Sequence, residues 1–218
     1  MNTIIVACKT LEEELNFALT QTGVSYPIEW LESGLHSVPK NLNSKLQDIF
    51  SGIHADRVLM VMGFCGSSIQ DITVGDFELI IPRIDDCISL LLGGAKIRAE
   101  ISRKYDAYFL TDGWLTGERN MWVEYQHTLE KYGEKRAKRI AEQLFKHYRS
   151  LCLLDSGAGS IDELIKKTNI IAETLNLKQE VIPASTDYIK QLLTGPWPHE
   201  KFIVKTPGQT ITSGDLIL

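Results

Sequence analysis

The sequence predicts an α/β protein in three layers, with a mostly parallel sheet covered by helices on both faces. Short apolar runs alternate with segments of helical periodicity, which is the pattern of parallel strands joined by helices. The run VLMVMGF at 58–64 contains no charged residue, as expected for a central strand that is buried on both faces. The 218 residues are 44% hydrophobic, which is enough for one sizeable core.

Strands and helices alternate regularly through the first half of the chain. Leu11, Leu15 and Ala18 follow helical spacing, and Gly23 is the residue type that commonly ends a helix. An aspartate pair at 85–86 can cap a further helix. The predicted elements are strands at 4–8, 27–31, 58–64 and 77–81 and helices at 11–22, 39–50 and 85–92.

The second half repeats this alternation. The predicted elements are strands at 105–110, 151–154, 180–182 and 202–205 and helices at 121–148, 161–175 and 187–193, the first of these helices being broken at Gly133. No linker composition separates the halves, so we expect a single domain over residues 1–218. A pseudo-boundary near residue 104 is the alternative, with two Rossmann-like halves around a cleft.

Charge and composition exclude several classes of protein. There are 23 Lys and Arg against 28 Asp and Glu, and glutamates interrupt the richest basic run at 131–149, so we expect no nucleic-acid partner. No apolar run approaches bilayer length, and the first residues have no basic leader, so we expect neither a membrane span nor a signal peptide. The expected compartment is the cytoplasm, where cysteines serve metal binding, catalysis or burial instead of disulfides.

Three of the four cysteines lie where a predicted strand ends. Cys8, Cys65 and Cys87 follow different strands, and the carboxyl ends of parallel strands are where α/β proteins bind ligands. Thiolates suit Zn²⁺ or an iron–sulfur cluster such as [4Fe-4S], and three protein ligands leave one open position. We therefore predict a metal site, with a metal-free reactive thiol or inert burial as alternatives. Cys152, inside the apolar run LCLL, is assigned to the core.

Polar residues near these cysteines are candidates for catalysis. His36 sits in a loop after a weak strand and is a potential fourth ligand or general base, with helix capping or a surface role as the alternative. Arg83 can hold a carboxylate or phosphate through its guanidinium group. Asp86 can orient a ligand or move a proton. The alternative for the last two is a helix cap with a surface ion pair.

Three further residues are candidates for cofactor binding. Gly63 and Gly66 flank Cys65 and allow close approach of backbone or ligand. Trp114 ends another predicted strand and can line a pocket for a planar ligand, although tryptophan is also a common core residue. The turn at 155–160 lacks a full glycine fingerprint and a P-loop lysine, so nucleotide binding is disfavoured.

Four motifs together resemble the bacterial and archaeal domain-of-unknown-function family 1638. They are LHSVP at 35–39, GFCG at 63–66, PRIDDC at 82–87 and LTDGW at 110–114. Genes of this family often lie near those of corrinoid-dependent methyltransferases, so the resemblance implies a link to corrinoid metabolism. It also implies that the candidate residues form one site: Cys8, His36, Cys65, Arg83, Asp86 and Cys87.

The expected function is that of a metal-dependent enzyme acting on a small molecule by methyl or thiol-group transfer, with a corrinoid as a further candidate cofactor. One alternative is a non-catalytic protein that binds or delivers a metal or corrinoid to a methyltransferase or corrinoid-protein partner. The sequence has no DxHxxG segment, which disfavours a dedicated corrinoid carrier. A second alternative is a metal-free enzyme with a cysteine nucleophile.

Overall fold

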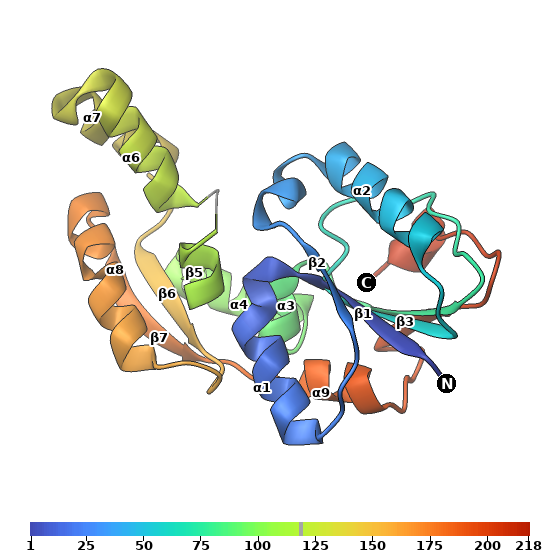
Figure 1. The fold of residues 1–218 in the computed structure, drawn as a ribbon. Helices are drawn as coiled ribbons and strands as arrows, with labels where there is room; N and C mark the ends of the chain where they lie inside the picture. Colours follow the sequence, from blue (N-terminus) through green and yellow to red (C-terminus); the bar gives the residue numbers. More distant parts are fainter. Residues whose placement is uncertain (118–119) are drawn as a thin grey trace.

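The structure, a computed structural model, describes residues 1–117 and 120–218, except for the side chains of residues 36 and 37. It confirms the predicted α/β class, because mostly parallel strands are surrounded by helices (Figure 1). The strands form two sheets instead of one continuous sheet. The second sheet begins at Ala107, directly after the predicted pseudo-boundary.

The first sheet has five strands in the order β2-β1-β3-β4-β8. They are β1 (Thr3–Cys8), β2 (Ile28–Leu31), β3 (Arg57–Val61), β4 (Glu78–Pro82) and β8 (Phe202–Lys205). The first four run parallel, whereas β8 pairs with β4 in the antiparallel direction. The chain moves from β1 outward to β2, then crosses back to β3 and continues to β4 on the other side. The order of the strands therefore reverses between β1 and β3.

The second sheet has three parallel strands in the order β5-β6-β7. They are β5 (Ala107–Leu110), β6 (Ser150–Asp155) and β7 (Lys178–Pro183). After β7 the chain returns to the first sheet, where it forms α9 (Asp187–Thr194) and β8. Residues 107–183 are thus inserted between two parts of the first unit.

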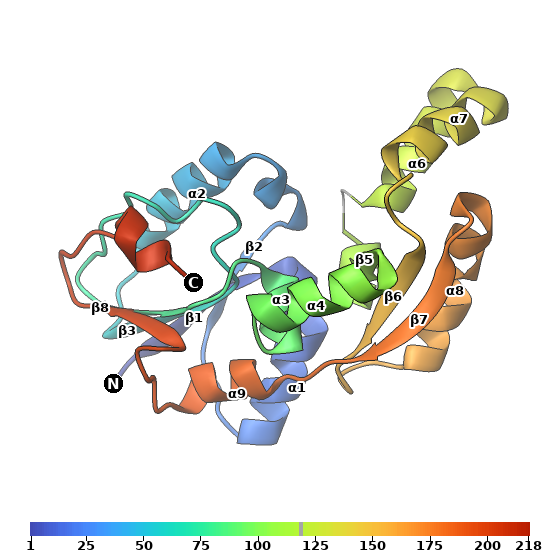
Figure 2. The same ribbon diagram turned by 180° about the vertical axis from the view of Figure 1, so that it is seen from behind.

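Helices α1 (Glu12–Thr22) and α9 pack together on one face of the first sheet, and α2 (Pro39–Gly52) covers the other face (Figures 1 and 2). Helix α8 (Ile161–Leu175) packs on β6 and β7, and the pair α6 (Met121–Tyr132) and α7 (Glu134–Leu144) projects beyond the second sheet. The remaining helical segments are η1 (Lys9–Leu11), η2 (Ser33–Ser37), α3 (Cys87–Leu92), α4 (Ala95–Tyr105), α5 (Asp112–Leu115) and η3 (Ser213–Leu216).

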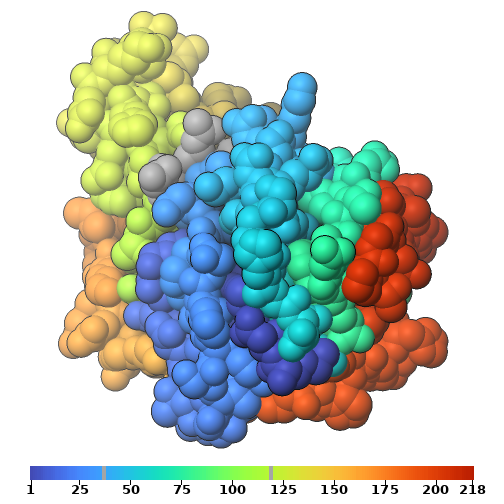
Figure 3. Space-filling model, turned by 45° about the vertical axis from the view of Figure 1, so that its right-hand side comes forward, coloured from blue at the N-terminus to red at the C-terminus, as the bar shows by residue number. Residues whose placement is uncertain are grey.

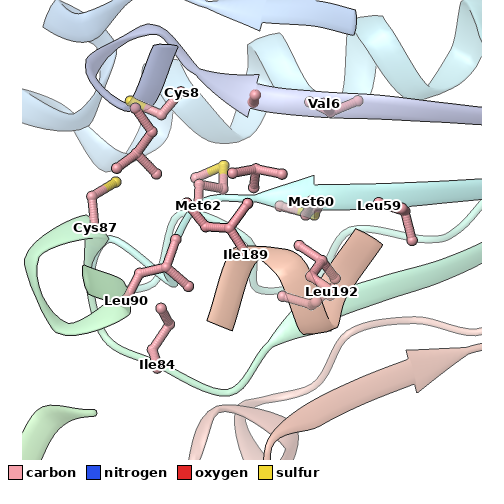
Figure 4. Close-up of a cluster of buried hydrophobic side chains, with 14 of the residues drawn as sticks. Val6, Cys8, Leu59, Met60, Met62, Ile84, Cys87, Leu90, Ile189 and Leu192 are labelled. Carbon is pink, nitrogen blue, oxygen red and sulfur yellow. The ribbon is translucent and has the colours of Figure 1, made fainter. Parts of the chain in front are cut away.

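The main core lies on the two faces of β1 and β3. Residues 58–62 of the run VLMVMGF are each at most 1% exposed, which confirms a central buried strand. Met60 and Met62 belong to the same buried cluster as Ile189 and Leu192 of α9 (Figure 4). This packing holds the carboxyl ends of β1, β3 and β4 firmly beside one another.

Most local signals predicted their elements correctly. Gly23 ends α1 in the left-handed conformation, and the Asp86 carboxylate caps α3 by accepting a hydrogen bond from the Ser89 amide. Gly133 separates α6 from α7, as predicted. Helix α4 was not predicted, because it has no buried residue and hence no apolar stripe to detect.

Candidate functional site

The three predicted cysteines lie at the carboxyl edge of the first sheet. Cys8 is the last residue of β1, Cys65 lies in the loop after β3, and Cys87 is the first residue of α3 after β4. The edge between β1 and β3 is also where the strand order reverses. In open α/β sheets, ligands bind in the crevice outside the strand ends at such a reversal. The cysteines therefore occupy the position in the fold where a ligand site is expected.

The three thiols form a chain with Cys87 in the middle. The thiols of both Cys8 and Cys65 affect the pKa of Cys87, which indicates that the three sulfur atoms lie near one another. Figure 4 shows Cys8 and Cys87 at the same end of the buried cluster. Cys8 is 8% exposed and Cys87 is 3% exposed, whereas Cys65 is half-buried. The Cys65 end of the chain is therefore the end nearest to solvent.

Gly63 is the residue that lets the loop after β3 approach the start of α3. A Cβ atom at this position would lie 2.5 Å from Asp86 Cα and 2.6 Å from Asp86 N, which is closer than real Cβ contacts. Two backbone hydrogen bonds fix the approach, from the Phe64 amide to the Ile84 carbonyl at 2.9 Å and from the Cys65 amide to the Asp85 carbonyl at 2.8 Å. The predicted importance of Gly63 is thus explained by backbone packing that positions Cys65 beside Cys87.

The thiols of Cys8 and Cys87 are held in the neutral form. The pKa of Cys8 is raised well above its ordinary value, first by the hydrogen bond with Cys87 and then by burial; a 3.0 Å contact with the Thr10 hydroxyl acts in the opposite direction. The pKa of Cys87 is likewise raised, first by its hydrogen bond with Cys65, while Cys8 and the Gly63 amide act against the shift. Because like charges cannot accumulate in a buried cluster, ionising these thiols requires a compensating cation.

The metal assignment itself stays a prediction. Within residues 1–117 and 120–218, no three or more His, Cys, Asp or Glu side chains already stand where they could hold a metal ion together. Cys87 is the thiol whose pKa responds to both of the others, so a shared ion would require Cys8 and Cys65 to close around it. The backbone of His36 lies in η2, but its side chain lies outside the described part of the structure.

Arg83 holds the carboxyl-terminal segment. Its guanidinium donates to the carbonyl oxygens of His199 at 3.0 Å, Asp215 at 2.9 Å and Ile217 at 3.2 Å. The segment around η3 lies against the loop between β3 and β4, where Thr73 forms an isolated bridge with Thr210 (Figure 3). The structure therefore gives Arg83 a tethering role, and its predicted role in binding an anion stays a prediction.

Asp86 has two structural partners. Its carboxylate accepts the Ser89 amide at 2.8 Å and pairs with Arg98 at 3.1 Å, so it both caps α3 and joins α3 to α4. This is the alternative that the sequence left open, a cap with an ion pair. By capping α3, Asp86 fixes the first turn of the helix that carries Cys87.

The remaining cofactor candidates lie around the same region. Gly66 has φ of +73°, in the left-handed region that favours glycine, and follows Cys65, whose φ is +46°. Trp114 lies in α5, is half-buried, and packs against the cores of both sheets. Its amide donates to the Thr111 hydroxyl at 3.3 Å. Trp114 thus joins the two halves, and the predicted contact of Gly66 and Trp114 with a cofactor stays a prediction.

One candidate residue was missed by the sequence reasoning. Glu14 is only 3% exposed, and burial raises its pKa to about 7. A signal was present, because Glu14 lies three residues after Leu11 and four before Ala18, on the apolar stripe of α1. A carboxylate on the buried face of a helix is uncommon and marks a second polar site.

Comparison with protein families identifies the class to which the chain belongs. Residues 30–193 match the profile of a family described as "Protein of unknown function (DUF1638)", so the chain belongs to this family. The matched region includes Cys65 and Cys87 and begins after Cys8. No curated protein and no solved structure matches the chain.

Proposed function

We propose that this protein is a metal-dependent enzyme in which Cys8, Cys65 and Cys87 together bind one soft metal centre. The observation that carries the proposal is that three thiols lie near one another at the strand ends where the strand order reverses. Thiolate sulfur prefers Zn²⁺ or an iron–sulfur cluster to hard cations. When bound, such a centre would supply Lewis acidity at a position left open by three protein ligands.

Three observations support the fit of the thiols to a metal. Burial and mutual contact keep Cys8 and Cys87 protonated, and a bound cation would remove this penalty. The Thr10 hydroxyl contacts the Cys8 sulfur, and the Gly63 amide interacts with the Cys87 sulfur. These groups would orient the two ligands. Cys65 lies at the exposed end, so the open position would face solvent and substrate.

The substrate we propose is a small molecule that undergoes methyl or thiol-group transfer. A substrate thiol bound to a soft metal would lose its proton at pH 7. The metal would thereby favour the thiolate, which is the nucleophilic form. The residues of this chain would bind the centre and keep its inner side dry, since Cys8 and Cys87 are almost fully buried. A corrinoid cofactor, or a corrinoid protein or methyltransferase as partner, stays part of the proposal.

The alternatives make different demands on the thiols. A metal-free nucleophile requires a lowered pKa, whereas the pKa values of Cys8 and Cys87 are raised, which disfavours either of them in that role. A delivery protein would bind the same metal without turnover, and a partner methyltransferase would be needed to detect its activity.

Four free cysteines favour a reducing compartment, and we propose the cytoplasm. Within the described parts of the chain, no helix combines the length and apolar character needed to cross a membrane.

Metal content tests the proposal, with the fourth cysteine as the matched control. The protein is purified without oxygen, and its zinc and iron contents and visible spectrum are measured beside those of Cys65→Ser, Cys87→Ser and Cys152→Ala. Cys152 lies in β6, away from the thiol chain. We expect about one metal centre in the wild type and in Cys152→Ala, and loss in the other two variants.

The spectrum identifies the metal. Broad visible absorption with bound iron would assign a cluster, whereas a colourless protein with bound zinc would assign Zn²⁺. A wild-type protein that contains neither metal after anaerobic purification, and that takes up neither on addition of zinc or iron and sulfide, would refute the proposal.

A further inference from the structure

A small polar cavity lies between the start of α1 and the loops that follow β5 and β6. Helix α1 lies between the two sheets in both views (Figures 1 and 2). The cavity has a volume of about 50 Å³ and is lined mainly by polar side chains. Those that carry the argument are Glu13, Glu14, Asp112, Asp155, Ser156 and Lys167. The cavity lies at the carboxyl ends of parallel strands of the second sheet, where ligands bind in α/β folds.

Glu14 is the least satisfied group of this cavity. The residue is buried, with only 3% of its surface exposed. Its Oε1 atom accepts one long hydrogen bond of 3.4 Å from the Ser156 hydroxyl, and its Oε2 atom has no hydrogen-bond partner among the described residues. A buried polar atom without a partner destabilises the fold, and more so when it is charged. The cavity therefore contains a buried carboxyl oxygen that has no hydrogen-bond partner among the described residues.

The charges around the cavity favour a cation. Glu13, Asp112, Asp155 and Glu163 add four carboxylates to that of Glu14, and Glu13 and Asp112 contribute to its raised pKa after burial itself. The Lys167 ammonium is already engaged, since it lies 2.6 Å from an Asp112 oxygen. The Glu14 carboxyl is therefore surrounded by more negative than positive side chains.

Two helices begin at this cavity, yet their amino termini do not favour an anion. Glu12, Glu13 and Glu14 occupy the first turn of α1, and Asp162 and Glu163 occupy the first turn of α8. These carboxylates balance the positive ends of the helix dipoles. The Ser160 hydroxyl accepts the Glu163 amide at 3.3 Å, so this amide of α8 is also satisfied.

We propose that this cavity binds one hard divalent cation, Mg²⁺ or Mn²⁺, with Glu14 Oε2 as a direct ligand and the other carboxylates acting through retained water. A water molecule needs roughly 10–15 Å³ of such space, so the cavity has room for a partly hydrated ion and too little for an organic ligand. Mg²⁺ is commonly held by one or two carboxylates and several waters. This arrangement agrees with the finding that, in the described part of the chain, no three potential ligands converge on one point.

The cavity and the thiol chain would select different metals. The cavity offers only oxygen donors, which suit Mg²⁺ and Mn²⁺, whereas the thiols suit zinc or iron. Occupancy of one site can therefore be measured while the other is disabled. The cation site does not depend on the function proposed for the thiols.

Binding of Mn²⁺ alone provides the test. The protein is treated with EDTA, desalted and titrated with MnCl₂, and free Mn²⁺ is followed by its EPR signal. We expect one site in the wild type, displaced by Mg²⁺, and at least tenfold weaker binding in Glu14→Gln. Glu12→Gln is the matched control, because Glu12 is adjacent in sequence, pairs with Lys9 at 2.7 Å and does not line the cavity.

Further variants separate the two sites. Cys65→Ser should bind Mn²⁺ like the wild type, and Asp155→Asn should bind it more weakly while keeping the thermal unfolding midpoint of the wild type. The proposal is overturned if the wild type binds no Mn²⁺ at millimolar concentration, or if Glu14→Gln binds it as tightly as the wild type. It is also overturned if Cys65→Ser abolishes binding, since the ion would then belong to the thiols.

Discussion

The buried carboxyl of Glu14 makes the stability of this protein depend on pH in a direction opposite to that of most carboxylates. Its pKa is raised from 4.5 to about 7, chiefly by burial. The folded state therefore holds the proton more strongly than the unfolded state does. The stabilising contribution is fully present below about pH 4.5 and is lost as the pH rises to about 7. Above pH 7 the folded protein contains a buried charge.

The magnitude follows from the size of the shift. Each pKa unit corresponds to about 1.4 kcal/mol, so the shift at Glu14 is worth about 3 kcal/mol. Replacement by glutamine keeps the shape of the side chain and removes the ionisation. We therefore expect Glu14→Gln to gain stability relative to the wild type by about 3 kcal/mol between pH 4.5 and pH 8.

Urea denaturation provides the assay. The free energy of unfolding of the wild type and of Glu14→Gln is measured in EDTA at half-unit steps from pH 4.5 to pH 8, and the difference is plotted against pH. Other titrating groups cancel in this difference. The matched control, Glu12→Gln, replaces an exposed carboxylate and should give a flat line. A flat line for Glu14→Gln, or one that slopes in the opposite direction, would refute the reasoning.

Three other perturbations test how the site is positioned. Gly63→Ala places a methyl group 2.5 Å from Asp86 Cα, so we expect about 1–3 kcal/mol of destabilisation in urea and faster alkylation of the thiols. Gly113→Ala places one against the Thr10 carbonyl oxygen, so we expect a similar loss in the same assay and reduced contact between the two halves, measured as faster amide exchange. Arg83→Met removes three hydrogen bonds to the carboxyl-terminal segment, so limited proteolysis should cleave this segment sooner.

Gly52→Ala is the common control for the two glycine substitutions. Gly52 is the last residue of α2, and no atom lies within 4 Å of an added Cβ atom. It should leave stability unchanged or raise it by up to about 1 kcal/mol. If Gly63→Ala or Gly113→Ala unfolds at the same urea concentration as Gly52→Ala, the close approaches do not constrain the fold. If Arg83→Met is cleaved at the wild-type rate, the tether is unimportant.

The neighbourhood of the cysteines could be predicted because its signals are local. Each cysteine follows a short apolar run, and parallel strands bring their carboxyl ends to one edge of a sheet. This reasoning predicted Cys8, Cys65 and Cys87 at the strand ends of one sheet, where the structure has them, and their role as one site stays a prediction. It needed only the position of each strand end, and no knowledge of contacts between distant segments.

The tethering role of Arg83 could not be predicted, because its partners are distant in sequence. Arg83 is held by carbonyl groups more than one hundred positions away, and no local pattern announces such contacts. Asp86 pairs with Arg98 on α4, a helix that itself has no apolar stripe. Glu14 could have been noticed, since its position on the apolar face of α1 is visible in the sequence.

The antiparallel strand β8 affects the order in which the protein can fold during synthesis. Strand β4 pairs with β3 on one side and with β8 on the other, and β8 lies at residues 202–205, near the end of the chain. Until these residues have left the ribosome, the outer edge of β4 has unpaired amide and carbonyl groups. The second sheet, at residues 107–183, is complete before then. The inserted unit can thus fold while the sheet that carries the thiols still has an open edge.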